Sequence, residues 1–338
     1  MRRPGGKRLR AALAAAGLGA LVGVAGLPDG FGRWETDRVS LRAGVACAQP
    51  PASENVRLDS RRAYQYLVRI CRIGPRPSGS AGMARQQALI AEHFSKLKAE
   101  VQFQSFEVSH PLTGASVRLQ NIFVVWHPER KDRILLACHY DTRPFPDRDP
   151  YNPRGKFIGA NDGASGVALL MELGHHIRQV TENSGFGVDF VFFDGEEFVF
   201  SANDKYFLGS EHFARQYRSE RPKHRYSCGV LLDMIGDKRL TIYMERNSWK
   251  HARALTESIW AAARRAGVRE FIPKLKYEVS DDHLPLNQIA GIPTCDIIDF
   301  DYPYWHTTRD VPTACSGASL VKVGRVLIEW IRELPPSE

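Results

Sequence analysis

The chain has 338 residues, a length that suits a single α/β enzyme domain, and it contains no internal repeat. Its formal net charge of +8 is concentrated ahead of the first acidic residue, Asp29, and the other basic residues are scattered without a basic–aromatic stripe, which argues against a nucleic-acid partner. Six cysteines without regular spacing do not form the pattern of a disulfide framework.

Residues 1–54 are predicted to be a targeting segment and linker. A cationic start is followed by residues 11–27, which are rich in Ala, Leu, Gly and Val. The length of this apolar run lies between that of a long signal peptide and that of a short membrane anchor. We therefore expect the protein to be exported, either secreted or periplasmic, or to be anchored in a membrane through residues 11–27. The catalytic domain is then expected to occupy residues 55–338.

The first half of this domain is predicted to begin with helices and continue with a strand pair. Residues 60–73 and 83–101 are helix-like, and the second segment has apolar residues spaced for one buried face. Residues 101–108 and 120–126 alternate in polarity, as an antiparallel pair at a sheet edge does. Residues 142–157, with their prolines and alternating charges, are expected to form a long loop that overhangs a functional site.

Further along the chain, apolar strand-like segments end in polar residues. These segments are 133–136, 187–193, 226–232 and 294–300, and helices are expected at 164–177, 248–266 and 316–334. In an open α/β sheet, sites form beyond the carboxyl ends of the strands. The polar residues at these ends are therefore expected to converge, and they are His139, Asp162, Glu196, Glu197, Asp233 and His306.

The adjacent pair Glu196 and Glu197, in the sequence GVDFVFFDGEE, is the most informative of these features. A turn at Gly195 can bring both side chains into one crevice. An apolar strand gains nothing from two mutually repelling acids at its tip, but in a metal site one carboxylate binds the cation while its neighbour moves protons. One such acid alone is usually a helix cap or a solvated surface group. The whole ordered set indicates zinc chemistry.

The motifs HYD, GANDGASG, FFDGEE, LGSEHFA, LLDMIG, DDHLP and WHT occur in the order of the M28 metallopeptidase-like family. The sequence resembles this family over residues 55–334, and most resembles its glutaminyl-peptide cyclotransferase (glutaminyl cyclase) branch. The resemblance implies a single-domain three-layer α/β/α sandwich around a mixed, mainly parallel sheet, as in zinc exopeptidases.

Three details favour the cyclase branch over the aminopeptidases. LACHYD, FFDGEE and LLDMIG resemble cyclase motifs, and the segment between Glu197 and Gly209 is long. Asp281, in Asp-Asp-His, stands where aminopeptidases of this kind typically have Ser. Trp305, before His306, stands where they typically have Tyr.

The resemblance also implies roles for single residues. Asp162, Glu197 and His306 would bind one catalytic zinc, with the fourth position left open. Glu196 would be the proton shuttle. Beside it, Asp233 and one of the pair Asp281–Asp282, by position Asp281, would form a hydrogen-bonded acid network. Trp305 would be a wall of the substrate pocket, and Asp282 is also expected at the substrate.

The implied reaction is the conversion of an N-terminal glutamine to pyroglutamate with release of ammonia, on peptide or protein substrates. The alternative is an M28-type aminopeptidase, in which His139 and Asp233 would bind a second zinc with Asp162 bridging. A third possibility, a binding domain without activity, is disfavoured because every expected ligand type is present.

The chain departs from the animal cyclases in two places. The Trp that those enzymes carry after the Glu pair is missing, and Phe198 or Phe200 is a candidate to replace its stacking surface. In the secretory animal enzymes, the cysteine equivalent to Cys138 pairs with a second cysteine a short way downstream. This chain has no cysteine there, so the corresponding disulfide is not expected.

Overall fold

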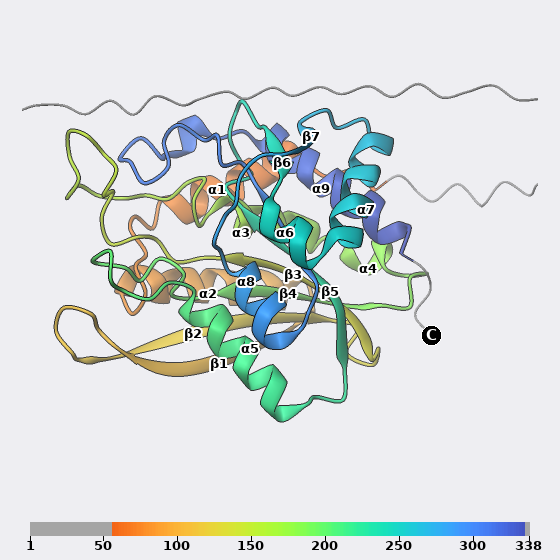
Figure 1. The fold of residues 1–338 in the computed structure, drawn as a ribbon, viewed down its shortest axis with the longest axis horizontal. Coiled ribbons are helices and arrows are strands. Elements are labelled where there is room, and N and C mark those ends of the chain that lie inside the picture. The colour runs from red at the N-terminus through yellow and green to blue at the C-terminus, as the bar shows by residue number, and fades with distance from the viewer. Residues whose placement is uncertain (1–55, 335–338) are drawn as a thin grey trace, which may run out of the picture. The chain divides into compact units, whose positions relative to one another are not determined.

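The computed structural model describes residues 56–334, and its centre is a six-stranded sheet with helices on both faces (Figure 1). The strands are β1 (Glu100–Ser109), β2 (Ser116–Trp126), β3 (Asp132–His139), β4 (Gly187–Phe193), β5 (Arg225–Asp233) and β8 (Thr294–Ile298). Their order in the sheet is β1-β2-β4-β3-β5-β8. The β1–β2 and β2–β4 pairs are antiparallel, and the pairs β4–β3, β3–β5 and β5–β8 are parallel. The predicted mixed sheet with an antiparallel pair at one edge is confirmed.

Two apolar layers pack against the two faces of this sheet. Along β3 the alternate residues Ile134 and Leu136 join a large core with helices α1 (Ser60–Cys71), α2 (Ala81–Lys96), α3 (Ser165–Leu173), α7 (Arg253–Arg265) and α9 (Gly317–Arg332). Leu135 and Ala137 face the other way, toward α5 (Leu208–Glu220) and the short turns α8 (His283–Pro285) and η1 (Leu286–Ala290). This alternation follows from the two-residue repeat of a strand, and it produces the three-layer α/β/α sandwich.

An ion pair between a buried carboxylate and a half-buried arginine joins the first helix to the third. Glu172 in α3 is fully buried and accepts hydrogen bonds from Nε of Arg62 at 2.6 Å and from the backbone N–H of Asp59 at 2.7 Å. Asp59 in turn caps α1 by accepting from the backbone N–H groups of Arg61 and Arg62. The start of α1 is thus fixed to a helix more than one hundred residues further along the chain.

Several elements differ from their predicted extent. The helix expected at 164–177 stops at Leu173 and is followed by the separate turn α4 (Ile177–Val180). The helix expected at 248–266 is divided into α6 (Arg246–His251) and α7, because Ala252 has the non-helical angles φ −140° and ψ 45°. The two-stranded sheet of β6 (Ile242–Met244) and β7 (Phe271–Leu275) and helix α5 were not predicted.

The remaining turn is the short 3-10 helix η2 (Pro312–Ala314). Within residues 56–334, no helix has the length and apolar character needed to cross a membrane. The predicted targeting segment and linker at 1–54 lie outside the described residues.

Candidate active site

The site lies where the parallel strands end. His139 is the last residue of β3, and Asp233 is the last residue of β5. Strand β4 ends at Phe193, and two residues later Gly195 turns the chain with φ +79° so that Glu196 and Glu197 follow. This left-handed backbone angle requires glycine, and a side chain here would also displace the Cδ2 methyl of Leu119, 2.4 Å away. The predicted turn at Gly195 is confirmed.

Asp162, Glu197 and His306 form the first group of metal-ligating atoms. One ligand atom from each lies within 4.8 Å of the others, and all three residues are buried. Nε2 of His306 is 3.1 Å from Oε1 of Glu197 and 3.5 Å from Oδ2 of Asp162. Oδ2 of Asp162 is buried and has no hydrogen-bond partner among residues 56–334. Two carboxylates and one imidazole, with one carboxylate oxygen free to bind a cation, match the ligand set of a catalytic zinc.

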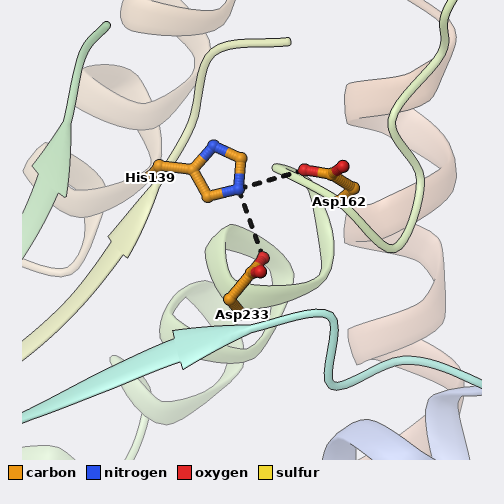
Figure 2. Close-up of side chains that lie close together, drawn as sticks. All are labelled: His139, Asp162 and Asp233. Carbon is orange, nitrogen blue, oxygen red and sulfur yellow. Dashed lines mark hydrogen bonds and ion pairs between the residues drawn. The ribbon is translucent and has the colours of Figure 1, made fainter. Parts of the chain in front are cut away.

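A second group shares one member with the first. Nε2 of His139 is 3.2 Å from Oδ1 of Asp162 and 3.2 Å from Oδ1 of Asp233. Figure 2 shows the imidazole of His139 directed at both carboxylates. The structure therefore brings together His139, Asp162 and Asp233, the residues that would bind a second zinc in an aminopeptidase. Asp162 belongs to both groups.

Two aspartates outside these groups hold the site together. Asp310 accepts from the backbone N–H groups of Asn161 at 2.8 Å and Asp162 at 3.1 Å, and so fixes the loop that carries Asp162. Asp141 accepts from the backbone N–H of Glu197 at 3.0 Å, and its other oxygen lies 3.5 Å from Nδ1 of His139. Each of these buried carboxylates therefore supports a candidate ligand through a direct contact.

The two adjacent glutamates have pKa values shifted in opposite directions. Burial alone would raise the pKa of Glu197, but the neighbouring His306 and Arg143 lower it to about 2. Burial, together with the negative charge of Glu197, raises the pKa of Glu196 well above its usual value. A carboxylate that stays ionised suits a metal ligand, and one that holds a proton near neutral pH suits an acid–base group.

The acidic residues Asp281 and Asp282, next to Glu196, also have raised pKa values. Burial and the charge of Asp233 raise the pKa of Asp281 well above its usual value. Burial likewise raises the pKa of Asp282 to about 7, although Ser210 donates a hydrogen bond of 2.5 Å to its Oδ1. Asp281 lines the pocket described below, whereas Asp282 is fully buried behind it and lies away from the pocket wall.

A cavity of about 410 Å³ opens over these groups, a volume within the range of small-molecule sites. Its wall includes Glu196, Asp233, Tyr206, Phe207 and the half-buried Trp305. The ring of Trp305 is 4.3 Å from that of His306 and 4.9 Å from that of Phe300, centre to centre. Aromatic groups and carboxylates therefore surround the same small space.

Tyr206 and Phe207, rather than the expected Phe198 or Phe200, supply the aromatic surface of the segment after the Glu pair. Phe198 packs edge-on against His110 at 5.4 Å and against Phe200 at 5.3 Å. The stacking surface is therefore found later in the segment than the sequence suggested.

Backbone strain gathers around the pocket. Phe207, Met234 and His306 have φ values of 59°, 47° and 56°, and all three line the cavity. Non-glycine residues with positive φ are uncommon and costly, and they persist where the surrounding structure holds them in place. The backbone is thus held in unfavourable conformations at the candidate ligand His306 and at two other residues of the pocket lining.

Sequence reasoning missed Arg143, Asp147 and Asp310. Arg143 donates to both carboxylate oxygens of Glu197 at 3.2 Å, and Asp147 lies 3.2 Å from Nδ1 of His306. Arg143 and Asp147 belong to the loop that was expected to overhang the site, and its alternating charges were the available signal.

Comparisons with known proteins agree with this geometry. Residues 121–331 match the model of the family described as peptidase family M28. The chain is 40% identical to Fimbriiglobus ruber glutaminyl cyclase, with a TM-score of 0.79 over 84% of this chain and 99% of that one. It is 29% identical, with a TM-score of 0.75 over 82% of this chain and 98% of the other, to a leucine aminopeptidase precursor from Bacteroides thetaiotaomicron. The glutaminyl-peptide cyclotransferase of Drosophila melanogaster is 26% identical over 258 residues, which are 70% of each chain.

Proposed function

The chain belongs to peptidase family M28, and we propose that it is a zinc-dependent glutaminyl-peptide cyclotransferase, which converts an N-terminal glutamine to pyroglutamate and releases ammonia. The observation that carries this proposal is the pocket in which Glu196 lies beside the group formed by Asp162, Glu197 and His306. The 40% identity to a glutaminyl cyclase over most of both chains supports it over the aminopeptidase alternative.

Asp162, Glu197 and His306 would hold one zinc ion. When bound, the ion would polarise the side-chain amide carbonyl of the substrate glutamine. The two carboxylates offset the charge of the cation in a buried site, and three protein ligands leave a position for the substrate oxygen.

Glu196 would carry the proton through the reaction. In its ionised form, Glu196 would accept a proton from the α-amine of the substrate, whose nitrogen attacks the side-chain amide carbon. A bond forms between this nitrogen and carbon, and the bond from the carbon to the amide nitrogen breaks. Glu196 returns the same proton to the departing nitrogen, which leaves as ammonia, so the peptide bond stays intact.

Asp233 and Asp281 would support this proton transfer. Their carboxyl groups lie close enough for the charge of Asp233 to raise the pKa of Asp281, and both line the pocket. Buried acids that repel one another keep a shared proton near neutral pH. A protonated Asp281 can also donate a hydrogen bond to a substrate group. Asp282, bonded to Ser210, would position Asp281 from behind.

Trp305 would select the substrate. Its flat ring precedes His306 in the chain and lines the same cavity, so it can pack against a small folded glutamine side chain. The attacking α-amine and the amide carbon that it attacks belong to the same glutamine. The enzyme therefore mainly needs to hold this residue in a folded conformation and to exclude other first residues.

A direct assay separates the candidate functions. The purified protein is incubated with a Gln-initiated peptide and with a Leu-initiated peptide, and both ammonia and free amino acids are measured. A cyclase releases ammonia from the Gln-peptide and lowers the mass of this peptide by about 17 Da, the mass of one ammonia molecule. Release of leucine without ammonia would contradict the proposal.

The second candidate is a two-metal aminopeptidase, favoured by one observation. His139, Asp162 and Asp233 also place ligand atoms within 4.8 Å of one another, next to the first group. Such an enzyme would need two zinc ions and would release the first residue of varied peptides.

We also propose that the protein is exported or membrane-anchored through residues 11–27. A cationic start followed by an apolar run supports this proposal. Cell fractionation of the full chain, with mass analysis of its N-terminus, would test it, and an intact N-terminus in the cytosolic fraction would contradict it.

A further inference from the structure

Two residues of the 142–157 loop contact the candidate zinc ligands from outside. Oδ1 of Asp147 lies 3.2 Å from Nδ1 of His306, on the opposite side of the ring from Nε2, which faces Glu197 and Asp162. Neither Asp147 nor Arg143 was among the residues that the sequence motifs assigned to the site. Both were found only when the structure brought the loop against it.

Arg143 links the two candidate ligands through this aspartate. Its Nε is 2.9 Å from Oδ1 of Asp147, and one terminal nitrogen donates to Oδ2 of Asp147 at 3.0 Å. The other terminal nitrogen donates to both oxygens of Glu197. The guanidinium is nearly buried, with 7% of its side chain exposed, and the hydroxyl of Tyr206 lies 3.2 Å from it. Each of the three guanidinium nitrogens of Arg143 therefore has at least one hydrogen-bond partner.

The rest of the loop is fastened so that this arrangement can persist. The backbone N–H of Arg148 donates to the carbonyl of His306 at 3.1 Å. Asp149 accepts from the backbone N–H of Thr308 at 2.8 Å and from its hydroxyl. The loop is therefore attached to the chain at His306 and two residues beyond it.

We propose that Asp147, held by Arg143, is a positioning residue of the zinc site. It accepts the Nδ1 proton of His306, so that Nε2 keeps its lone pair directed between Glu197 and Asp162. A histidine whose second nitrogen donates to a carboxylate is fixed in one tautomer and one ring orientation, and becomes a more basic ligand. Arg143 holds the carboxylates of Asp147 and Glu197 at a set separation. This inference rests on the proposed zinc site.

The test measures zinc affinity rather than activity. The zinc dissociation constants of the wild type, Asp147→Ala and Asp147→Asn are determined on the full chain by competition with a chromogenic chelator. Loss of an outer partner of a metal ligand typically weakens binding by about 10–100-fold, which is the expected result for Asp147→Ala. Asp147→Asn should lose less, because the amide oxygen still accepts from Nδ1 but carries no charge.

Three controls separate positioning from folding. Asp147 has 49% of its side chain exposed, and Arg143 keeps its bonds to Glu197 and Tyr206 without it, so its replacement should lower the unfolding free energy of the zinc-free protein by less than it lowers the free energy of zinc binding. Tyr151→Ala changes a residue of the same loop that is 95% exposed, and should keep wild-type zinc affinity. Arg143→Lys keeps the charge but cannot bridge two carboxylates, and should weaken zinc binding.

The outcomes distinguish this inference from the proposed zinc site itself. Glu197→Gln must abolish tight zinc binding, and if it does not, the assigned site is wrong. If Glu197→Gln abolishes binding while Asp147→Ala binds zinc within about twofold of the wild type, far below the expected loss, the positioning role is overturned. An equal loss of zinc affinity and of zinc-free stability would overturn it as well. The visible spectrum of the cobalt(II)-loaded protein should also change in Asp147→Ala.

Discussion

Nε2 of His139 lies 3.2 Å from Oδ1 of Asp233, so the two residues are joined by a direct hydrogen bond at the edge of the candidate site. The nitrogen that a second cation would need is thus engaged by a carboxylate. Surrounding carboxylates also overcome the effect of burial and raise the pKa of His139 well above its usual value. Nε2 of His306 faces Oε1 of Glu197 in the same way, at 3.1 Å, so the expectation of one metal ion per chain rests on the likeness to glutaminyl cyclases.

The first prediction concerns this metal count. Zinc content measured after gentle dialysis should be one equivalent per chain, and His139→Gln should retain that equivalent because His139 is not one of its ligands. Glu197→Gln should lose it, because a neutral amide is a poor zinc ligand. Two equivalents in an active preparation, with one lost in His139→Gln, would instead support the aminopeptidase.

The second prediction concerns the proton carrier. Glu196→Gln should keep zinc but lower kcat by about 10²–10⁴-fold, since an amide has the same shape but cannot accept and return a proton. Zinc content and ammonia release are measured on the same preparation. If Glu196→Gln lost zinc and Glu197→Gln kept it, the roles within the pair would be reversed.

The third prediction concerns the substrate pocket. Trp305→Ala should lower kcat/KM for a Gln-peptide by at least about tenfold, because an aromatic contact of this kind, with its buried area, is worth ~1.5 kcal/mol or more. Zinc content should be unchanged, since Trp305 is not a ligand. Trp305→Phe, which keeps an aromatic face, is the matched control and should recover part of the activity. Equal activity of the alanine and phenylalanine variants would contradict a stacking role.

The fourth prediction concerns stability far from the site. Burial alone would raise the pKa of Glu172, but His176, whose Nε2 lies 3.7 Å from Oε1 of Glu172, and the hydrogen bonds from Arg62 lower it to about 2. Because the folded pKa is below the unfolded one, this group stabilises the fold fully above pH ~4.5, the usual pKa of Glu, and its contribution is lost as the pH falls toward 2. Glu172→Gln should cost about 1–2 kcal/mol at pH 7, because Arg62 loses its charged partner but, with 34% of its side chain exposed, keeps part of its hydration.

Urea unfolding of the zinc-free protein at several pH values checks this prediction. The wild type should lose stability between pH 5 and pH 2, and Glu172→Gln should lose less over the same range. Parallel pH profiles for the two proteins would show that Glu172 is not responsible.

The sequence predicted the sheet and the convergence of the site residues because both depend on strong local signals. Apolar runs such as 187–193 can be read as buried strands, and the parallel-sheet rule then places the residues after them at one edge. The helix around 208–220 was missed because its apolar face is narrow, with Phe213 and Ala214 among its few buried apolar residues. The break at Ala252 has no glycine or proline to announce it.

The charges of the 142–157 loop could draw attention to Arg143 and Asp147, but sequence reasoning could not identify their partners. Arg143 and Asp147 lie four positions apart in a segment without regular structure, where spacing does not fix direction. Their partners Glu197 and His306 are 54 or more residues away, and nothing in the local sequence indicates these pairings. Asp282 shows the same limit, since a neighbour of Asp281 in sequence proves to be buried away from the pocket.

The separation of the ligands along the chain has a consequence for how the protein matures. Glu197 and His306 are 109 residues apart, and each follows a different strand of the sheet. Contacts of such long range form late, because loop closure must come before they can stabilise the chain. A short peptide cut from this sequence therefore cannot assemble the zinc site, and metal uptake reports that the sheet has closed. Zinc binding can accordingly serve as a kinetic marker of the last stage of folding.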